Sequence, residues 1–66
     1  MNSEIIEKLK VEQADLLDKL HRLILFINSE NAKLLTKKHR DLLINQFFVM
    51  EEYFKILQSR IDDLGE

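Results

Sequence analysis

Seven apolar residues recur along the C-terminal half of the chain at intervals that alternate strictly between four and three. They are Leu43, Phe47, Met50, Phe54, Leu57, Ile61 and Leu64. In a helix, this spacing returns each side chain to one face about every 3.5 residues, which is the heptad pattern of coiled coils. The pattern therefore predicts a long helix whose apolar face is buried against another helix.

A second heptad series occupies the N-terminal half of the chain. Its members are Ile6, Leu9, Gln13, Leu16, Leu20, Leu23 and Ile27, of which only Gln13 is polar. A polar residue within such a series typically fixes the register or pairs with a partner copy. We therefore predict a first helix over about residues 4–28, capped by Ser3, and a second over about 37–64, capped by Thr36 and ended by Gly65.

The two series match each other in antiparallel order without a slip. Paired positions have residue numbers that sum to 70 throughout, from Ile27 with Leu43 to Ile6 with Leu64. We therefore predict an all-α fold, an antiparallel two-helix hairpin, in a single domain over residues 1–66. Residues 29–35 are expected to form one helical turn capped by Ser29, with Leu34 or Leu35 covering the end of the hairpin.

The composition favours helix and points to self-association. The 66 residues include no cysteine, no proline and one glycine. A chain of this length buries little apolar surface by itself, and disulfides are excluded, so oligomerisation is the expected stabiliser. The net charge of −2 and the absence of a long apolar run or a leader-like N-terminus lead us to expect a soluble, cytoplasmic protein.

Apolar residues also lie on both sides of the paired faces, where a lone hairpin would leave them in water. We expect them to form an oligomer interface made of Leu17, Ile24, Leu42, Ile44, Phe48, Val49, Tyr53 and Ile56. A dimeric four-helix bundle, a larger closed ring and a surface that binds a host protein all fit such patches. Membrane binding is disfavoured because the polar faces carry charges of both signs.

Four basic residues form the first turn of the second helix. Lys37, Lys38, His39 and Arg40 follow the Thr36 cap directly. The helix dipole favours acidic residues at this end, so the run opposes helix stability. A helix N-terminus with added cations suits a phosphate or another anion.

Other readings of this basic run remain open. It fits a solvated turn, or a charge matched to an acidic terminus of a neighbouring subunit, since Asp62 and Asp63 lie at the opposite end of the same helix. Four cations without interleaved aromatic residues make a weak nucleic-acid footprint.

Catalytic and metal-binding motifs are not found in the sequence. No nucleophile triad order, glycine-rich loop or Walker pattern is present. Asp18 and His21 have a spacing used by metal ligands in helical bundles, but the predicted register places them on the outer face. We therefore expect a protein that is not an enzyme and has no metal and no cofactor.

The layout resembles a family of very short bacteriophage helical-hairpin proteins related to a small crAss-like phage protein. The matching residues are Ser29-Glu30, Leu35, Arg40-Asp41-Leu42-Leu43, Gln46, Met50, Tyr53 and Leu57-Gln58-Ser59-Arg60-Ile61. Where that family's turn is similar to Leu-Ser-Glu-Glu-Gln, this chain has Leu35-Thr36-Lys37-Lys38-His39.

The resemblance implies an antagonist of bacterial immunity, since small phage hairpins of this kind include such proteins. Our leading hypothesis is an oligomeric, non-catalytic hairpin, acting in the cytoplasm of an infected bacterium, that sequesters an anionic cyclic nucleotide at Lys37, Lys38, His39 and Arg40. The alternatives are a protein–protein inhibitor of a host defence protein and a structural or regulatory phage coiled-coil protein.

Overall fold

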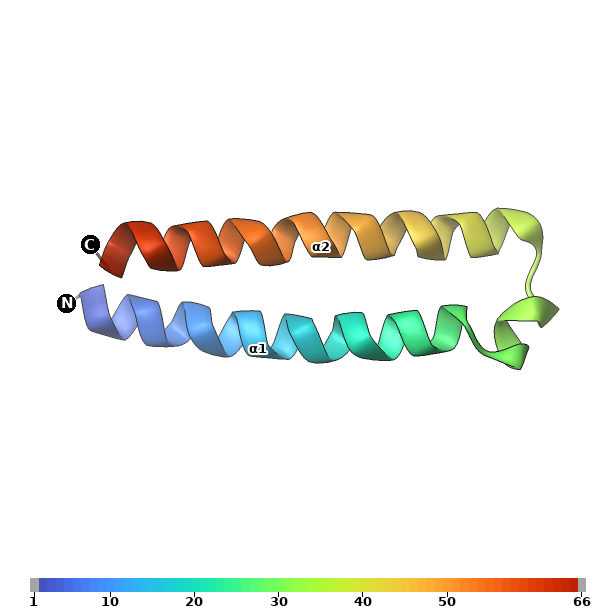
Figure 1. The fold of residues 1–66 in the computed structure, drawn as a ribbon, viewed down its shortest axis with the longest axis horizontal. Coiled ribbons are helices and arrows are strands. Elements are labelled where there is room, and N and C mark those ends of the chain that lie inside the picture. Colours follow the sequence, from blue (N-terminus) through green and yellow to red (C-terminus); the bar gives the residue numbers. More distant parts are fainter. Residues whose placement is uncertain (1, 66) are drawn as a thin grey trace.

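The computed structural model, which describes residues 2–65, is an antiparallel hairpin of two long helices (Figure 1). Helix α1 spans Asn2–Ile27, the short 3₁₀ helix η1 spans Glu30–Leu34, and α2 spans Lys37–Gly65. The two helices run side by side along a rod of 48 × 15 × 11 Å, with both chain ends at one tip and η1 at the other. The predicted all-α hairpin is confirmed.

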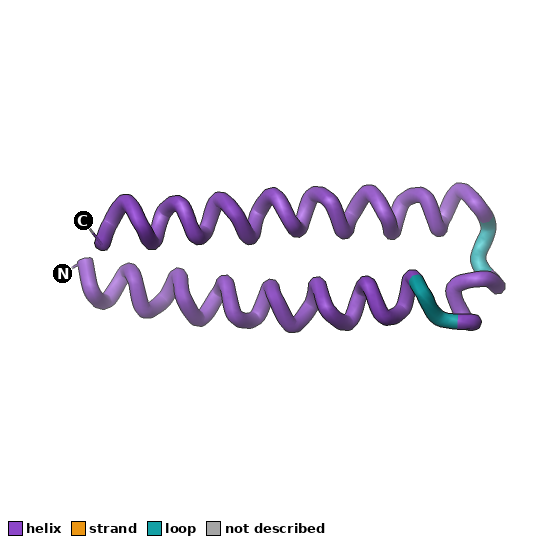
Figure 2. Tube along the Cα trace, in the orientation of Figure 1, coloured by secondary structure: helices purple, strands orange, loops and turns teal. Residues whose placement is uncertain are grey.

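Helix covers nearly the whole described chain, and loops are confined to the two sides of η1 (Figure 2). Helix α1 begins at Asn2, two residues before the predicted start, so the prediction that Ser3 caps it is wrong, because Ser3 lies within the helix. Helix α2 begins at the predicted Lys37. The prediction of a C-cap glycine is wrong, because Gly65 is the last residue of α2 and no glycine has a positive φ angle. The helical conformation thus extends through Gly65 without a left-handed turn.

The core consists of residues from the two heptad series. Its buried members are Leu9, Leu16, Leu20, Leu57 and Ile61, and the half-buried residues packed against them are Ile6, Phe47, Met50, Phe54 and Leu64. Leu57 has no exposed surface at all. Each series therefore supplies the face that the other buries, as the matched residue numbers predict.

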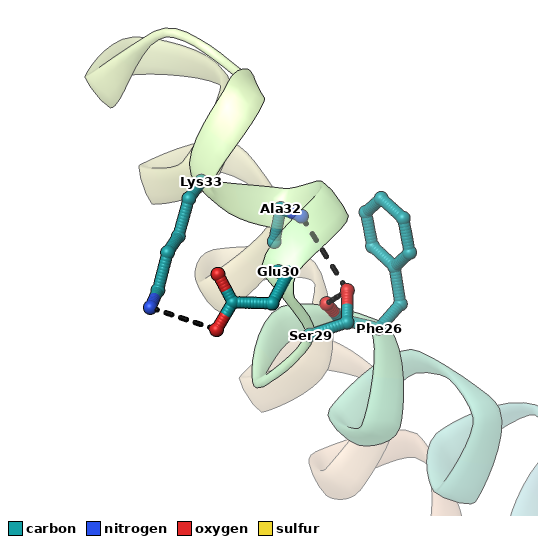
Figure 3. Close-up of polar contacts among 5 residues, drawn as sticks. All are labelled: Phe26, Ser29, Glu30, Ala32 and Lys33. Carbon is teal, nitrogen blue, oxygen red and sulfur yellow. Dashed lines mark hydrogen bonds and ion pairs between the residues drawn. The ribbon is translucent and has the colours of Figure 1, made fainter.

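The tip of the hairpin is held by Ser29 (Figure 3). Its hydroxyl accepts a hydrogen bond from the amide of Ala32 at 3.4 Å and donates one to the carbonyl of Phe26 at 2.6 Å. Lys33 and Glu30 form an ion pair at 3.1 Å on the outside of the same turn. Ser29 thereby ends α1 and caps η1 at once, which confirms its predicted capping role.

Ala32 covers the end of the hairpin, together with the half-buried Leu35. Ala32 is 3% exposed, whereas Leu34 is 84% exposed, so the prediction that Leu34 or Leu35 fills this place holds for Leu35 only. A 3₁₀ helix has three residues per turn, and residues three apart share a face. Ala32 and Leu35 are three apart and are joined by a 3.2 Å backbone hydrogen bond, while Leu34 lies on another face.

Candidate functional site

The basic turn, residues 37–40, begins α2 and is fixed by Thr36. The Thr36 hydroxyl accepts a hydrogen bond from the amide of His39 at 3.1 Å, and its carbonyl accepts the first helical bond, from the amide of Arg40, at 3.0 Å. The predicted N-cap is therefore confirmed. The amides of Lys37 and Lys38 precede the first helical bond and stay available to solvent or to an anion.

The four basic side chains point in different directions around α2. Successive residues of a helix are rotated by about 100°, so four in a row cover most of its circumference. Lys37 and Lys38 line a shallow hollow with Asp41, Leu42 and Asn45. A single chain therefore spreads the four basic side chains around the helix and does not gather them at one point.

Arg40 belongs to a different and smaller pocket. It lies beside Ile27 and Ala32 at the tip of the hairpin, with Leu43 and Ile44 on the same helix. This pocket has a volume of about 80 Å³, which is too small for a nucleotide base. Arg40 is an exposed residue, so it can contact an anion that lies outside the pocket.

Lys37 has an intrachain partner that the predicted set of binding residues omitted. Its ammonium forms an ion pair with Asp41 at 2.8 Å, and both side chains are largely exposed. The spacing of four residues signals this pair, although the base-first order is the weaker orientation on a helix. Among residues 2–65, Lys38, His39 and Arg40 make no ion pair within 4 Å. The cationic character of the turn therefore rests mainly on Lys38 and Arg40.

An apolar groove runs along one side of the hairpin between α1 and α2. It has a volume of about 380 Å³, and its lining is Leu17, Leu20, His21, Ile24, Phe47, Glu51, Phe54 and Lys55. Two predicted interface residues, Leu17 and Ile24, thus form part of its wall. Ile44 and Phe48 continue the same side towards the tip and are exposed.

The other predicted interface residues lie on a separate face of α2, here named the outer stripe. It consists of Leu42, Val49 and Ile56, which are seven residues apart, with Tyr53 beside them. Their side chains are 54%, 62%, 56% and 41% exposed, respectively. The groove and the outer stripe lie on opposite sides of the buried seam, so the predicted interface residues form two separate surfaces, one on each side of the paired faces.

His21 is a wall residue of the groove. Asp18, which has ligand spacing to it, forms an ion pair with Arg22. The carboxylate that shares the groove with His21 is Glu51. Residues 2–65 contain no group of three histidine, cysteine or carboxylate side chains placed to hold a metal ion. Within the same range, no helix has an apolar stretch long enough to cross a bilayer.

The fold and its surfaces define a small helical-hairpin protein with a cationic helix end and two exposed apolar faces. The Sequestin family model matches residues 3–63, and the chain belongs to the Sequestin family. The family name is consistent with a sequestering function, which fits a protein that binds a ligand or partner. No curated protein matches the chain, and no solved structure matches it.

Proposed function

We propose that the protein is a phage-encoded, non-catalytic antagonist of bacterial immunity that sequesters an anionic, cyclic nucleotide signal in the host cytoplasm. The observation that carries the proposal is the basic turn at the capped N-terminus of α2, in a chain of the Sequestin family. Sequestration needs only stoichiometric binding, with a dissociation constant below the concentration of the signal. Sequestration therefore suits a 66-residue chain that has a basic turn and exposed apolar faces for binding but no catalytic motif in its sequence.

Phosphate chemistry matches this end of α2. Free amides and the positive end of the helix dipole attract an anion, and lysine and arginine side chains add charge-assisted hydrogen bonds. Lys38, His39 and Arg40 are exposed and make no ion pair within the described part of the chain, so binding would not have to break one. Lys37 would exchange Asp41 for the ligand at little cost, because exposed ion pairs stabilise weakly.

Because the basic side chains point in different directions, one ligand can be bound in more than one arrangement. A cyclic nucleotide with two or three phosphates can contact the Lys37 and Lys38 side, the Arg40 side, or basic turns from two copies of the chain. In each arrangement the apolar side chains beside the turn, such as Leu42 and Ile44, offer a surface for a base.

Calorimetry with a panel of cyclic dinucleotides, cyclic trinucleotides and ADP-ribose derivatives tests the proposal. We expect at least one ligand to bind with a fixed stoichiometry and to be recovered chemically intact after the protein is denatured. Recovery of a cleaved ligand would show that the protein acts by catalysis and would contradict sequestration. Failure of every member of the panel to bind would contradict the nucleotide proposal.

Charge reversal locates the site on the turn. The pair Lys37→Glu with Lys38→Glu and the pair His39→Gln with Arg40→Glu remove the two sides of the turn separately. A matched control for the lysine pair is Lys8→Glu with Lys10→Glu, which changes the net charge by the same amount on α1, at the far tip of the hairpin. We expect at least one turn variant to weaken binding about tenfold or more, which is the loss of one charged hydrogen bond, while the control binds normally.

A protein–protein inhibitor of a host defence protein is the second candidate, and the exposed outer stripe favours it. Leu42, Val49 and Ile56 form an apolar strip of the kind that binds a partner helix. In that case, Val49→Glu abolishes capture of a purified defence protein, and nucleotides do not compete. A structural phage coiled-coil protein would show neither activity.

A further inference from the structure

Glu51 differs from the other charged residues of the hairpin in its burial. Every other aspartate, glutamate, lysine and arginine among residues 2–65 is exposed, whereas Glu51 is half-buried in the wall of the apolar groove. Within that range, no basic side chain lies within 4 Å of its carboxylate, and no hydrogen bond to it is formed. A carboxylate that has lost part of its hydration without gaining a partner is stabilised by a hydrogen-bond donor that enters the groove.

The groove has the size and the walls of a site for a flat ring. Its volume of about 380 Å³ falls within the range of small-molecule sites. Helix α2 contributes Phe47 and Phe54 to its lining, and α1 contributes Leu17 and Ile24. Phe47 is supported by an edge-to-face contact with Phe48, with the ring centroids 5.9 Å apart and the planes at 75°. Aromatic and aliphatic walls of this kind suit a planar ring that can stack.

Hydrogen-bonding groups of both kinds line the same groove. Glu51 offers acceptors, while His21 of α1 and Lys55 of α2 offer donors. Lys55 forms its ion pair with Glu52, at 3.4 Å, and leaves the carboxylate of Glu51 without a cation. The complementary ligand is a flat heteroaromatic ring whose edge carries an amino group beside ring acceptors. Adenine and guanine have such edges, whereas uracil carries no amino group.

We propose that the groove binds an aminopurine base, which stacks against the phenylalanine rings of α2 and donates its amino hydrogens to Glu51. The inference rests on the proposed function, because the base belongs to the nucleotide that the protein sequesters. It adds the class of base that is recognised and the residue that recognises it.

The groove and the basic turn can contact one ligand because Arg40 and Glu51 lie on the same side of α2. They are eleven residues apart, which is about three helical turns. Phe47, at the near end of the groove, is about 10 Å from Arg40 along the helix axis. A cyclic nucleotide can thus place one base in the groove while a phosphate lies towards the Arg40 guanidinium.

Titration with adenosine and uridine, followed by NMR of the isotope-labelled protein, tests the groove without any phosphate. We expect adenosine to shift the amide signals of residues 47–55 in a saturable manner and to bind about tenfold or more tightly than uridine. Equal affinities, or adenosine shifts confined to residues 37–40, overturn the proposal. The absence of any shift overturns it as well, in favour of a protein segment as the occupant of the groove.

The nucleoside result and the cyclic-nucleotide result are separable. Cyclic nucleotides that bind while adenosine leaves the groove unperturbed would keep the proposed function and overturn the groove site. Adenosine that binds in the groove while every cyclic nucleotide fails would keep the groove site and contradict sequestration of such a signal.

Glu51→Gln tests the carboxylate as the recognition group. The change keeps the shape of the side chain and removes its charge, so adenosine should bind about tenfold more weakly. The matched control is Glu12→Gln, which removes the same charge at an exposed position of α1 outside the groove. We expect the control to bind adenosine like the wild type. Equal affinities of the two variants would contradict the role of Glu51.

Leu17→Arg tests whether the ligand occupies the groove itself. Leu17 is 40% exposed, so a longer side chain can fill the groove from α1 and bring a guanidinium towards Glu51. Leu25→Arg adds the same charge at a side chain of α1 that is 71% exposed and lies outside the groove. We expect Leu17→Arg to abolish adenosine binding and Leu25→Arg to preserve it, with circular dichroism showing that both keep their helices. Adenosine binding that survives Leu17→Arg in a folded protein overturns the groove site.

Discussion

Gln13 of α1 and Gln58 of α2 are joined by a hydrogen bond across the hairpin, with Gln13 Nε2 donating to Gln58 Oε1 at 2.9 Å. Gln58 also makes a second hydrogen bond, in which its Nε2 donates to the carboxylate of Asp62 at 2.9 Å. Gln13 is the one polar member of the two heptad series and is half-buried. Its amide therefore has a partner within its own chain, and a second copy is not needed to satisfy it.

Replacing Gln13 by leucine should stabilise the hairpin. The change extends the apolar seam by one layer and removes a half-buried amide, so we expect the free energy of unfolding to rise by about 1 kcal/mol. The midpoint of thermal unfolding, followed by circular dichroism at fixed protein concentration, should rise by roughly 4–8 °C. Gln13→Ala, which loses the bond without gaining packing, should lower it. A leucine variant less stable than the alanine variant would show that the hydrogen bond outweighs burial.

Leu57 is expected to be the most sensitive position of the core. It is fully buried between the helices, so Leu57→Ala should cost about 2–5 kcal/mol, comparable to the whole stability of a domain this small. Urea titration monitored by helix signal measures the loss. Leu25→Ala removes the same atoms from a side chain that is 71% exposed and should change stability by less than about 0.5 kcal/mol. Equal effects of the two variants would contradict the burial of Leu57 between the helices.

The hairpin and its register could be predicted because they depend on long-range periodicity. The two heptad series give fourteen positions, and every pair across the hairpin must have residue numbers with the same sum. The buried Leu9, Leu16, Leu57 and Ile61 all belong to these series. Such agreement is hard to obtain by accident. The two helix bounds beside the turn followed from Ser29 and Thr36, whose side chains make the expected capping bonds, whereas the predicted caps Ser3 and Gly65 at the outer bounds both lie within helices.

The turn and the binding surfaces could be predicted only in part. Heptad spacing does not apply to a 3₁₀ segment, so it did not indicate that Ala32, and not Leu34, is buried. The basic run reads as one cluster in the sequence, but the helix spreads its side chains over two hollows and pairs Lys37 with Asp41. Periodicity shows that both flanks are apolar, but it carries no information about which flank a partner covers.

The tip of the hairpin offers a direct test of which residue fills it. Ala32→Leu adds three carbon atoms at a buried position in η1 and should lower the free energy of unfolding by about 1–3 kcal/mol through overpacking. Leu34→Ser removes an exposed leucine and should leave stability within about 0.5 kcal/mol of the wild type. Thermal unfolding of the two variants decides the matter. A larger loss for Leu34→Ser would place Leu34 in the core of the tip.

Thr36 links the stability of α2 to the charge at its N-terminus. Thr36→Ala removes the acceptor of the His39 amide and should cost about 1 kcal/mol. Thr36→Asp keeps an acceptor at that position and adds a negative charge beside the basic turn and the helix dipole. It should therefore match or exceed the wild type by about 0.3–1 kcal/mol at low ionic strength.

Salt separates the two contributions of Thr36→Asp. In 1 M NaCl the electrostatic gain should disappear, because charges are screened over about 3 Å, while the loss in Thr36→Ala persists. Thermal unfolding of the three proteins at both salt concentrations measures this difference. The added carboxylate should also repel an anionic ligand, so Thr36→Asp is expected to be a stable hairpin with weakened nucleotide binding. Unchanged nucleotide affinity in this variant would place the ligand away from the N-terminus of α2.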